Sequence, residues 1–150
     1  MQVGRGKLAK VKSGLTHFAI VEVEIADSTS AAVVEIRCTG QGWVAQGYIE
    51  EVSAEGYDHW KKGAVAGVLF ALKELPSLQK FIAITKIEGL TTDTNPSIVA
   101  FASAHAVWNA LGHKPSDSAV TQLEGVAFTS WSRDNDYIPF ALLDVSQNTT

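Results

Sequence analysis

Cysteine is almost missing from this chain. Cys38 is the only one among 150 residues, which excludes an intramolecular disulfide and any metal site built from several cysteines. The four histidines, His17, His59, His105 and His113, do not have the paired spacing of a metal-binding motif such as H-E-x-x-H. We therefore expect no metal centre and no cofactor.

Long hydrophobic runs and a strong charge of one sign are lacking as well. The longest apolar stretch in a helical context, residues 63–72, spans ten residues and is too short to cross a bilayer. The opening MQVGRGKLAK has no apolar core of a secretory signal. The formal net charge of −4 argues against nucleic-acid binding over the whole surface. We expect a cytoplasmic protein with no membrane association.

The sequence motifs of common enzymes are also absent. The chain has no G-x-S-x-G nucleophile elbow, no G-x-G-x-x-G dinucleotide motif and no P-loop. The segment SRDNDY contains Asp134 and Asp136, but it lacks the glycine and distal glutamate of a calcium loop. His105 lies on an apolar helix face, where it is either a core residue or part of a site. With no catalytic residue to name, we expect a non-enzymatic protein.

The chain has 46% hydrophobic and 19% charged residues, a composition typical of a globular protein. Its length predicts a single domain over residues 1–150. Alternating hydrophobic residues predict strands over residues 17–26, 32–38 and 80–88. The turn-forming residues 27–30 favour a hairpin between the first two. The basic segment 4–12 is interpreted as an edge strand, and residues 43–48 as a short strand bent by glycines.

Two helices are predicted. The first spans residues 52–75, with Ser53 as its N-cap. Within it, Gly63 and Gly67 lie one turn apart, which indicates close approach of another backbone. The second helix spans residues 96–111 between the N-cap Asn95 and Gly112, and it is apolar almost all round, so we expect it to be central.

The C-terminal extension, residues 113–150, is predicted to add a hairpin. Residues 121–131 and 137–145 are apolar enough to form strands, and residues 132–136 would be the turn. This hairpin would cover the apolar side of the first helix that is otherwise left uncovered. Together the elements predict an α+β fold, a two-layer sandwich in which two helices lie on one face of a mostly antiparallel sheet of about four strands.

Two segments resemble the fourth domain of translation elongation factor G. Residues 45–72, AQGYIEEVSAEGYDHWKKGAVAGVLFAL, are similar to that family's strand end and first helix. Residues 87–111, IEGLTTDTNPSIVAFASAHAVWNAL, are similar to its strand, tip loop and alanine-rich second helix. Gly4-Arg5-Gly6 is similar to a glycine–arginine–glycine run in the family's other tip loop. The resemblance covers residues 4–112 and implies an uncommon left-handed strand–helix–strand crossover.

The functional expectation is a small non-enzymatic binding module that acts through a surface. Residues 64–72 and Trp131 offer more apolar surface than a small domain hides, so a protein partner or a second copy of the chain is expected. The alternative is contact with RNA or the ribosome, as the resemblance implies. A second alternative is an enzyme with an unrecognised site, because relatives of the fold include enzymes. The candidate contact residues are Arg5, Lys7, Lys10, Lys12, Thr91, Thr92, Asp93 and Thr94, although the last four also suit an ordinary strand-to-helix connection.

Overall fold

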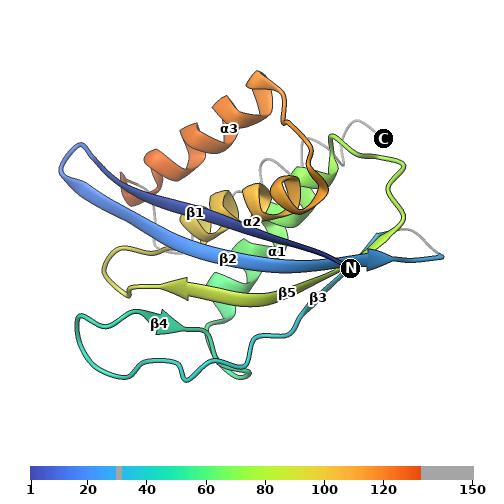
Figure 1. Cartoon of the computed structure of the whole chain (residues 1–150). Coiled ribbons are helices and arrows are strands. Elements are labelled where there is room, and N and C mark those ends of the chain that lie inside the picture. The colour runs from blue at the N-terminus through green and yellow to red at the C-terminus, as the bar shows by residue number, and fades with distance from the viewer. Residues whose placement is uncertain (30–31, 133–150) are drawn as a thin grey trace.

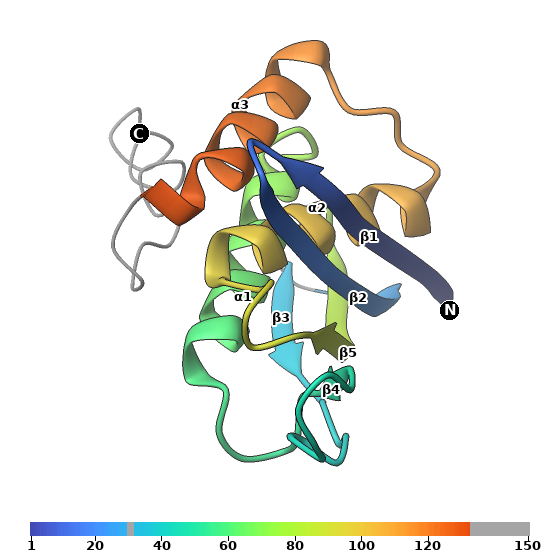
Figure 2. The same cartoon turned by 90° about the vertical axis from the view of Figure 1, so that its left-hand side faces the viewer.

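A β-sheet covered by helices on one face makes up the two layers of the fold (Figures 1 and 2). The computed structural model describes residues 1–29 and 32–132. The helices are α1 (Asp58–Leu72), α2 (Pro96–Leu111) and α3 (Asp117–Phe128). The predicted α+β class is confirmed.

In the part of the chain that the structure describes, the sheet is mixed and has five strands. They are β1 (Gln2–Lys12), β2 (Leu15–Asp27), β3 (Val33–Ile36), β4 (Glu50–Glu51) and β5 (Lys80–Gly89). The order across the sheet is β1-β2-β5-β3, and β4 also pairs with β5. Among these described strands, only the β3–β5 pairing is parallel. The basic N-terminal segment is the edge strand β1, as predicted.

The predicted hairpin between residues 17–26 and 32–38 is wrong. Strand β2 pairs with β1 on one side and β5 on the other, so both of its edges are occupied. Strand β3 instead runs parallel to β5, with Val34 opposite Ile82 and Ile36 opposite Ile84. Turn-forming residues do not determine the partner of the strand that follows them, and the partner of β3 lies far away in the sequence.

The crossover from β3 through α1 to β5 is left-handed. In Figure 1, β5 and its parallel neighbour β3 run to the left, β3 lies below β5, and α1 lies behind the sheet. Figure 2 shows the helices on that same side. Crossovers of this kind are almost always right-handed, so the arrangement is the uncommon one that the resemblance implies.

Helix α1 begins later than predicted. Gly56 and Tyr57 both have positive φ values, 83° and 58°, and this left-handed backbone cannot continue an α-helix. Ser53 is not the N-cap, because its hydroxyl donates to the carbonyl of Glu55 within the preceding turn. The predicted short strand at residues 43–48 is also wrong, because these residues form an exposed loop between β3 and β4.

Helix α2 is the centre of the fold, as predicted. The Asn95 side chain accepts a hydrogen bond from the Ile98 amide at 2.9 Å, and Gly112 ends the helix with φ 62°. The helix packs against β1 and β2 of the sheet and against α1 beside it. A Cβ atom added at Gly63 or Gly67 would overlap backbone atoms of α2, so the predicted close backbone approach is confirmed.

The C-terminal part differs most from the prediction. Residues 121–131 belong mainly to helix α3, which buries Ala119, Leu123 and Ala127 at a spacing of four. Helix α3 packs on α2, so the described part of the extension is not a hairpin on α1. The predicted strand 137–145 lies outside the described residues, as does the turn before it apart from Ser132.

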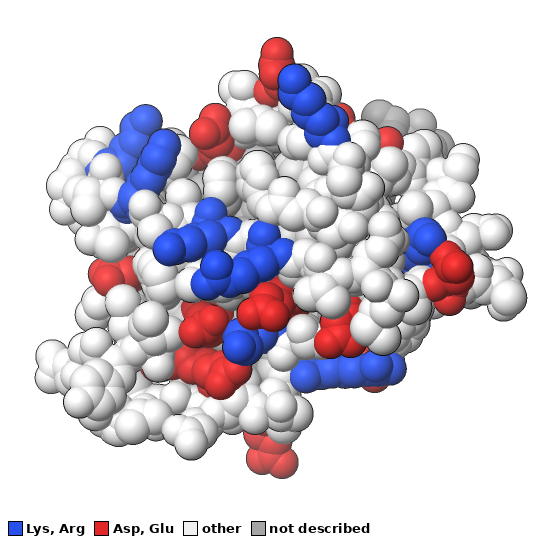
Figure 3. All heavy atoms as spheres, in the orientation of Figure 1, with Lys and Arg blue, Asp and Glu red and all other residues white. Residues whose placement is uncertain are grey.

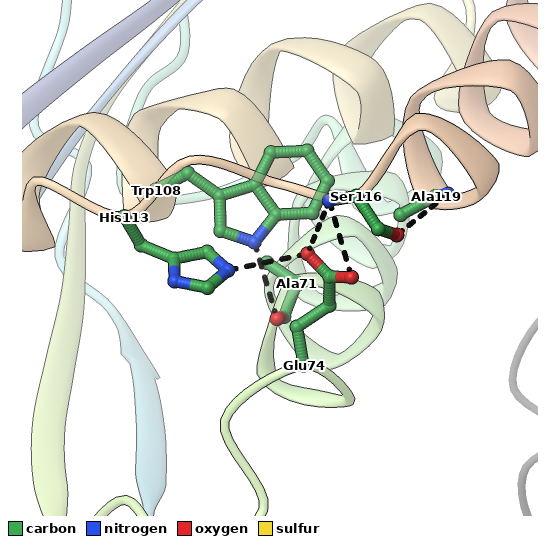
Figure 4. Close-up of polar contacts among 6 residues, drawn as sticks. All are labelled: Ala71, Glu74, Trp108, His113, Ser116 and Ala119. Atoms are coloured by element: carbon green, nitrogen blue, oxygen red, sulfur yellow. Dashed lines mark hydrogen bonds and ion pairs between the residues drawn. The ribbon is translucent and has the colours of Figure 1, made fainter.

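Glu74 fixes the connection between α2 and α3 (Figure 4). Its carboxylate accepts hydrogen bonds from the Ser116 amide at 3.0 Å and contacts Nε2 of His113 at 3.2 Å. Burial raises the pKa of Glu74, but the bonds from Ser116 and His113 outweigh it, so the pKa lies below its usual value. Ser116 in turn caps α3 by accepting from the Ala119 amide.

Candidate functional site

Three connections meet at one end of the sheet, which we call the tip (Figure 1). They are the β1–β2 turn at residues 13–14, the loop at residues 39–49 before β4, and the β5–α2 loop at residues 90–94. Antiparallel pairing of β1 with β2 and of β4 with β5 brings these connections to the same end. The tip is therefore a surface built by segments that lie far apart in the sequence.

A buried carboxylate holds two of these loops together. Glu50 on β4 is only 4% exposed, and it accepts hydrogen bonds from the Thr91 amide at 2.7 Å and from the Thr91 hydroxyl. It also accepts from the Tyr57 hydroxyl at 2.9 Å. Burial, followed by the bond to Glu50, raises the pKa of Tyr57 to about 12. The phenol therefore keeps its proton and remains a donor at neutral pH.

The tip contains a hollow of about 380 Å³ between these two loops. Trp43 and Tyr48 line it from one side and are 63% and 64% exposed. Thr91 and Thr92 line it from the other side. Residues 39–49 carry no charged side chain, and Val44 and Ile49 are also exposed. The result is an uncharged surface rich in exposed hydrophobic and aromatic groups.

The structure brings some of the predicted contact residues to this hollow. Thr91 and Thr92 are exposed and Asp93 is partly exposed. Thr94 is buried; its hydroxyl donates to the Phe18 carbonyl at 2.6 Å and accepts from the Leu90 amide at 2.8 Å. Thr94 therefore positions the loop and does not lie on its surface.

The four predicted basic residues do not form one patch. Gly4, Gly6 and Leu8 face α2 and are buried, so Arg5 and Lys7 point to the opposite, open face of the sheet. Figure 3 shows acidic side chains among the basic ones on that face. Lys10 and Lys12 lie on the helix side, with their Nζ atoms 5.8 and 5.0 Å from the ring centre of Phe128. Gly4-Arg5-Gly6 lies within β1, away from the tip loops.

Cys38 and His105 both lie in apolar surroundings. The sequence left open whether His105 is a core residue or part of a site. Burial raises the pKa of Cys38 to about 11, which keeps the thiol protonated at neutral pH. His105 packs against Phe101 and Trp108, and burial lowers its pKa while nearby Glu124 opposes the shift. Within residues 1–29 and 32–132, no cluster of three histidine, cysteine or acidic residues could hold a metal.

A second buried histidine was not predicted as a feature. His17 is fully buried against Phe128, and neither ring nitrogen has a hydrogen-bond partner among residues 1–29 and 32–132. Trp131, expected to expose apolar surface, is partly buried, and its indole N–H donates to the Thr16 carbonyl at 3.0 Å. The Glu50 network and the Trp43–Tyr48 surface were not predicted from the sequence either. Their only signal in the sequence is the absence of charged residues from the stretch 39–49.

Comparison with known proteins identifies the fold alone. No protein-family model and no curated protein matches the chain. A crystal structure of a protein from Thermus thermophilus is similar, with a TM-score of 0.57, 15% identity, and coverage of 75% of this chain and 16% of that chain. None of the helices in the described part of the chain is long and apolar enough to span a membrane.

Two kinases are also matched at lower TM-scores. Mevalonate kinase from methicillin-resistant Staphylococcus aureus has a TM-score of 0.41 and 12% identity, over 86% of this chain and 45% of that chain. Homoserine kinase from Cytophaga hutchinsonii has a TM-score of 0.42 and 14% identity, over 95% of this chain and 46% of that chain. The chain thus spans less than half the length of each of these three proteins.

Proposed function

We propose that the chain is a non-enzymatic binding module that contacts a protein partner through its tip. The observation that carries the proposal is the uncharged loop 39–49, which exposes Trp43 and Tyr48 beside the Thr91–Thr92 edge. The centres of protein–protein interfaces are depleted of charge and enriched in tryptophan and tyrosine. A solvated loop with no binding role would be expected to carry charged groups instead.

The anchoring of the tip supports this proposal. Glu50 ties loop 90–94 to β4 and, through Tyr57, to the start of α1. A surface that is already ordered loses less conformational entropy when a partner binds. The network therefore favours a preformed contact surface over a mobile loop.

We further propose that the module is related to the fourth domain of elongation factor G. The left-handed β3–α1–β5 crossover and the position of the β5–α2 loop at the tip support this relationship.

A paired substitution tests the protein-binding proposal. The variant Trp43→Ser with Tyr48→Ser removes both exposed aromatic rings, and Val3→Ser removes an exposed hydrophobic group from the end of β1 far from the tip as a control. Proteins retained from a cell extract by the wild type and the control, but not by the tip variant, would be purified. We expect the tip variant to weaken the measured affinity at least about tenfold, as for central aromatic interface residues. Equal retention by all three forms would contradict the proposal.

Contact with RNA is the second candidate function. The observation in its favour is the pair of exposed rings, since unpaired bases stack on aromatic side chains. Lys10 and Lys12 lie next to the 13–14 turn of the same tip and could contact phosphates. Retention of ribosomal RNA at low salt, lost in Lys10→Glu with Lys12→Glu, would favour this function. Absence of RNA retention by the wild type would exclude it.

A further inference from the structure

The two edges of the sheet differ in their charge. At the β1 edge, Arg5, Lys7, Lys10 and Lys12 are the only charged residues of the strand, and all are basic. A second copy pairing along β1 would bring like charges together, a common device against edge-to-edge association. Strand β1 is therefore protected against self-pairing.

At the β3 edge, in contrast, the charges favour pairing with a second copy of the same strand. Glu35 and Arg37 flank Ile36, and within one chain their side chains form an ion pair at 3.2 Å. If a second β3 paired antiparallel with Ile36 opposite its own copy, Glu35 would lie opposite Arg37 of that copy, and Arg37 opposite its Glu35. The sequence Glu35-Ile36-Arg37 is thus self-complementary, because opposite charges directly across a strand pair stabilise it.

Beside this edge lies an apolar groove between β3 and α1. It has a volume of about 460 Å³, and its hydrophobic wall consists of Ile36, Val65, Ala66 and Leu69. Leu69 is 41% exposed although it lies in a helix without a polar side chain from Ala64 onwards. In the part of the chain that the structure describes, no strand lies beyond β3 at this edge.

We propose that two copies of the chain pair through β3, antiparallel about Ile36, and that Leu69 and Val65 of each copy pack across the twofold axis. Such an interface is isologous, so one patch must complement itself. The Glu35–Arg37 arrangement meets that requirement and selects a second copy as the occupant of the groove. This inference is independent of the tip and of the partner proposed for it.

Sedimentation velocity of the full chain from micromolar to millimolar concentration tests the pairing. The wild type is expected to pass from monomer to dimer. Glu35→Arg or Arg37→Glu alone places like charges opposite each other twice per dimer and should weaken dimerisation by about tenfold or more. The double variant Glu35→Arg with Arg37→Glu should restore it, because the swapped pair is again self-complementary. Both side chains are exposed, so these variants are expected to fold.

Two further variants locate the interface. Leu69→Asp should abolish the dimer, whereas Val11→Asp, an equally drastic change on the exposed β1 edge, should leave it intact. Circular dichroism before and after heating checks that each variant is folded. A wild type that stays monomeric throughout, a single charge reversal without effect, or a double variant as weak as the single ones would overturn the proposal.

Discussion

Replacing Gly67 by alanine should destabilise the protein, although alanine is the better helix former. In an exposed helix, glycine to alanine stabilises by up to about 1 kcal/mol. In α1, a Cβ at Gly67 would lie less than 3.0 Å from the carbonyl group of Ala100, and one at Gly63 equally close to that of Pro96. Because the clashing atoms belong to the backbone of α2, no side chain can move aside to relieve the overlap.

The expected loss of unfolding free energy follows from how far α1 and α2 must separate. Ordinary contact between a methyl group and a carbonyl needs the α1 and α2 backbones to move apart by about 1 Å. Forcing an extra methyl group into a packed core costs about 1–3 kcal/mol, and the gain in helix propensity offsets up to about 1 kcal/mol of this. We therefore expect Gly63→Ala and Gly67→Ala each to lower the free energy of unfolding by about 1–2 kcal/mol. The double variant should lose less than the sum, because the first methyl group already separates the helices.

Urea unfolding followed by circular dichroism measures these changes. Gly125→Ala is the matched control, because Gly125 lies inside helix α3 and a Cβ there would meet no atom of the described residues within 4 Å. This control should gain stability by up to about 1 kcal/mol. If all three alanine variants were stabilised alike, the close approach of α1 and α2 would not be what retains the glycines.

Three other changes have defined outcomes. Asn95→Ala removes the N-cap of α2 and should lower the unfolding free energy by about 1–2 kcal/mol, while Asn95→Asp, which can still accept the capping bond, should lose less in the same urea assay. Cys38 should react with a thiol reagent at pH 8 only as fast as the protein unfolds, because burial raises its pKa to about 11; rapid modification of the folded protein would contradict its burial. Glu74 has a pKa below its usual value, so its stabilising contribution is present above the unfolded-state pKa and is lost as the pH falls through the folded-state pKa. Unfolding curves of wild type and Glu74→Gln should therefore differ at neutral pH and converge in acid.

The elements that could be predicted are those whose signals are local in the sequence. Asn95, Pro96 and Gly112 set the limits of α2 by their own backbone chemistry. The alternation in β2 correctly assigned the buried face of that strand. The pair Gly63 and Gly67 predicted a close backbone approach, since the cost of two helical glycines needs a compensating contact.

The errors have physical reasons of two kinds. The partner of β3 is set by β5, which lies more than forty residues later in the sequence, so the turn at residues 27–30 could not reveal it. In α3, the spacing of Ala119, Leu123 and Ala127 is helical, but residues 121–131 were interpreted as a strand because they are apolar. The helical signal was therefore present in the sequence of α3.

The candidate site was harder to predict than the fold. Glu50 and Thr91 are 41 residues apart, and neither stands out in the sequence. Their contact depends on the pairing of β4 with β5, a two-residue ladder that no periodicity indicates. The separation of Arg5 and Lys7 from Lys10 and Lys12 likewise became visible only when the direction of each side chain on β1 was known.

The position of the tip depends on how α2 is held. Glycines contact its backbone from two sides: Gly63 and Gly67 from α1, and Gly4 and Gly6 from β1. Contacts between backbones leave a helix less freedom than contacts between flexible side chains, because no rotamer change can accommodate a shift. Loop 90–94 enters α2 directly and is fixed at its other side by Glu50. The exposed tip surface is thus attached to a helix that backbone contacts hold from two sides, and a preformed binding surface of the kind proposed requires such rigidity.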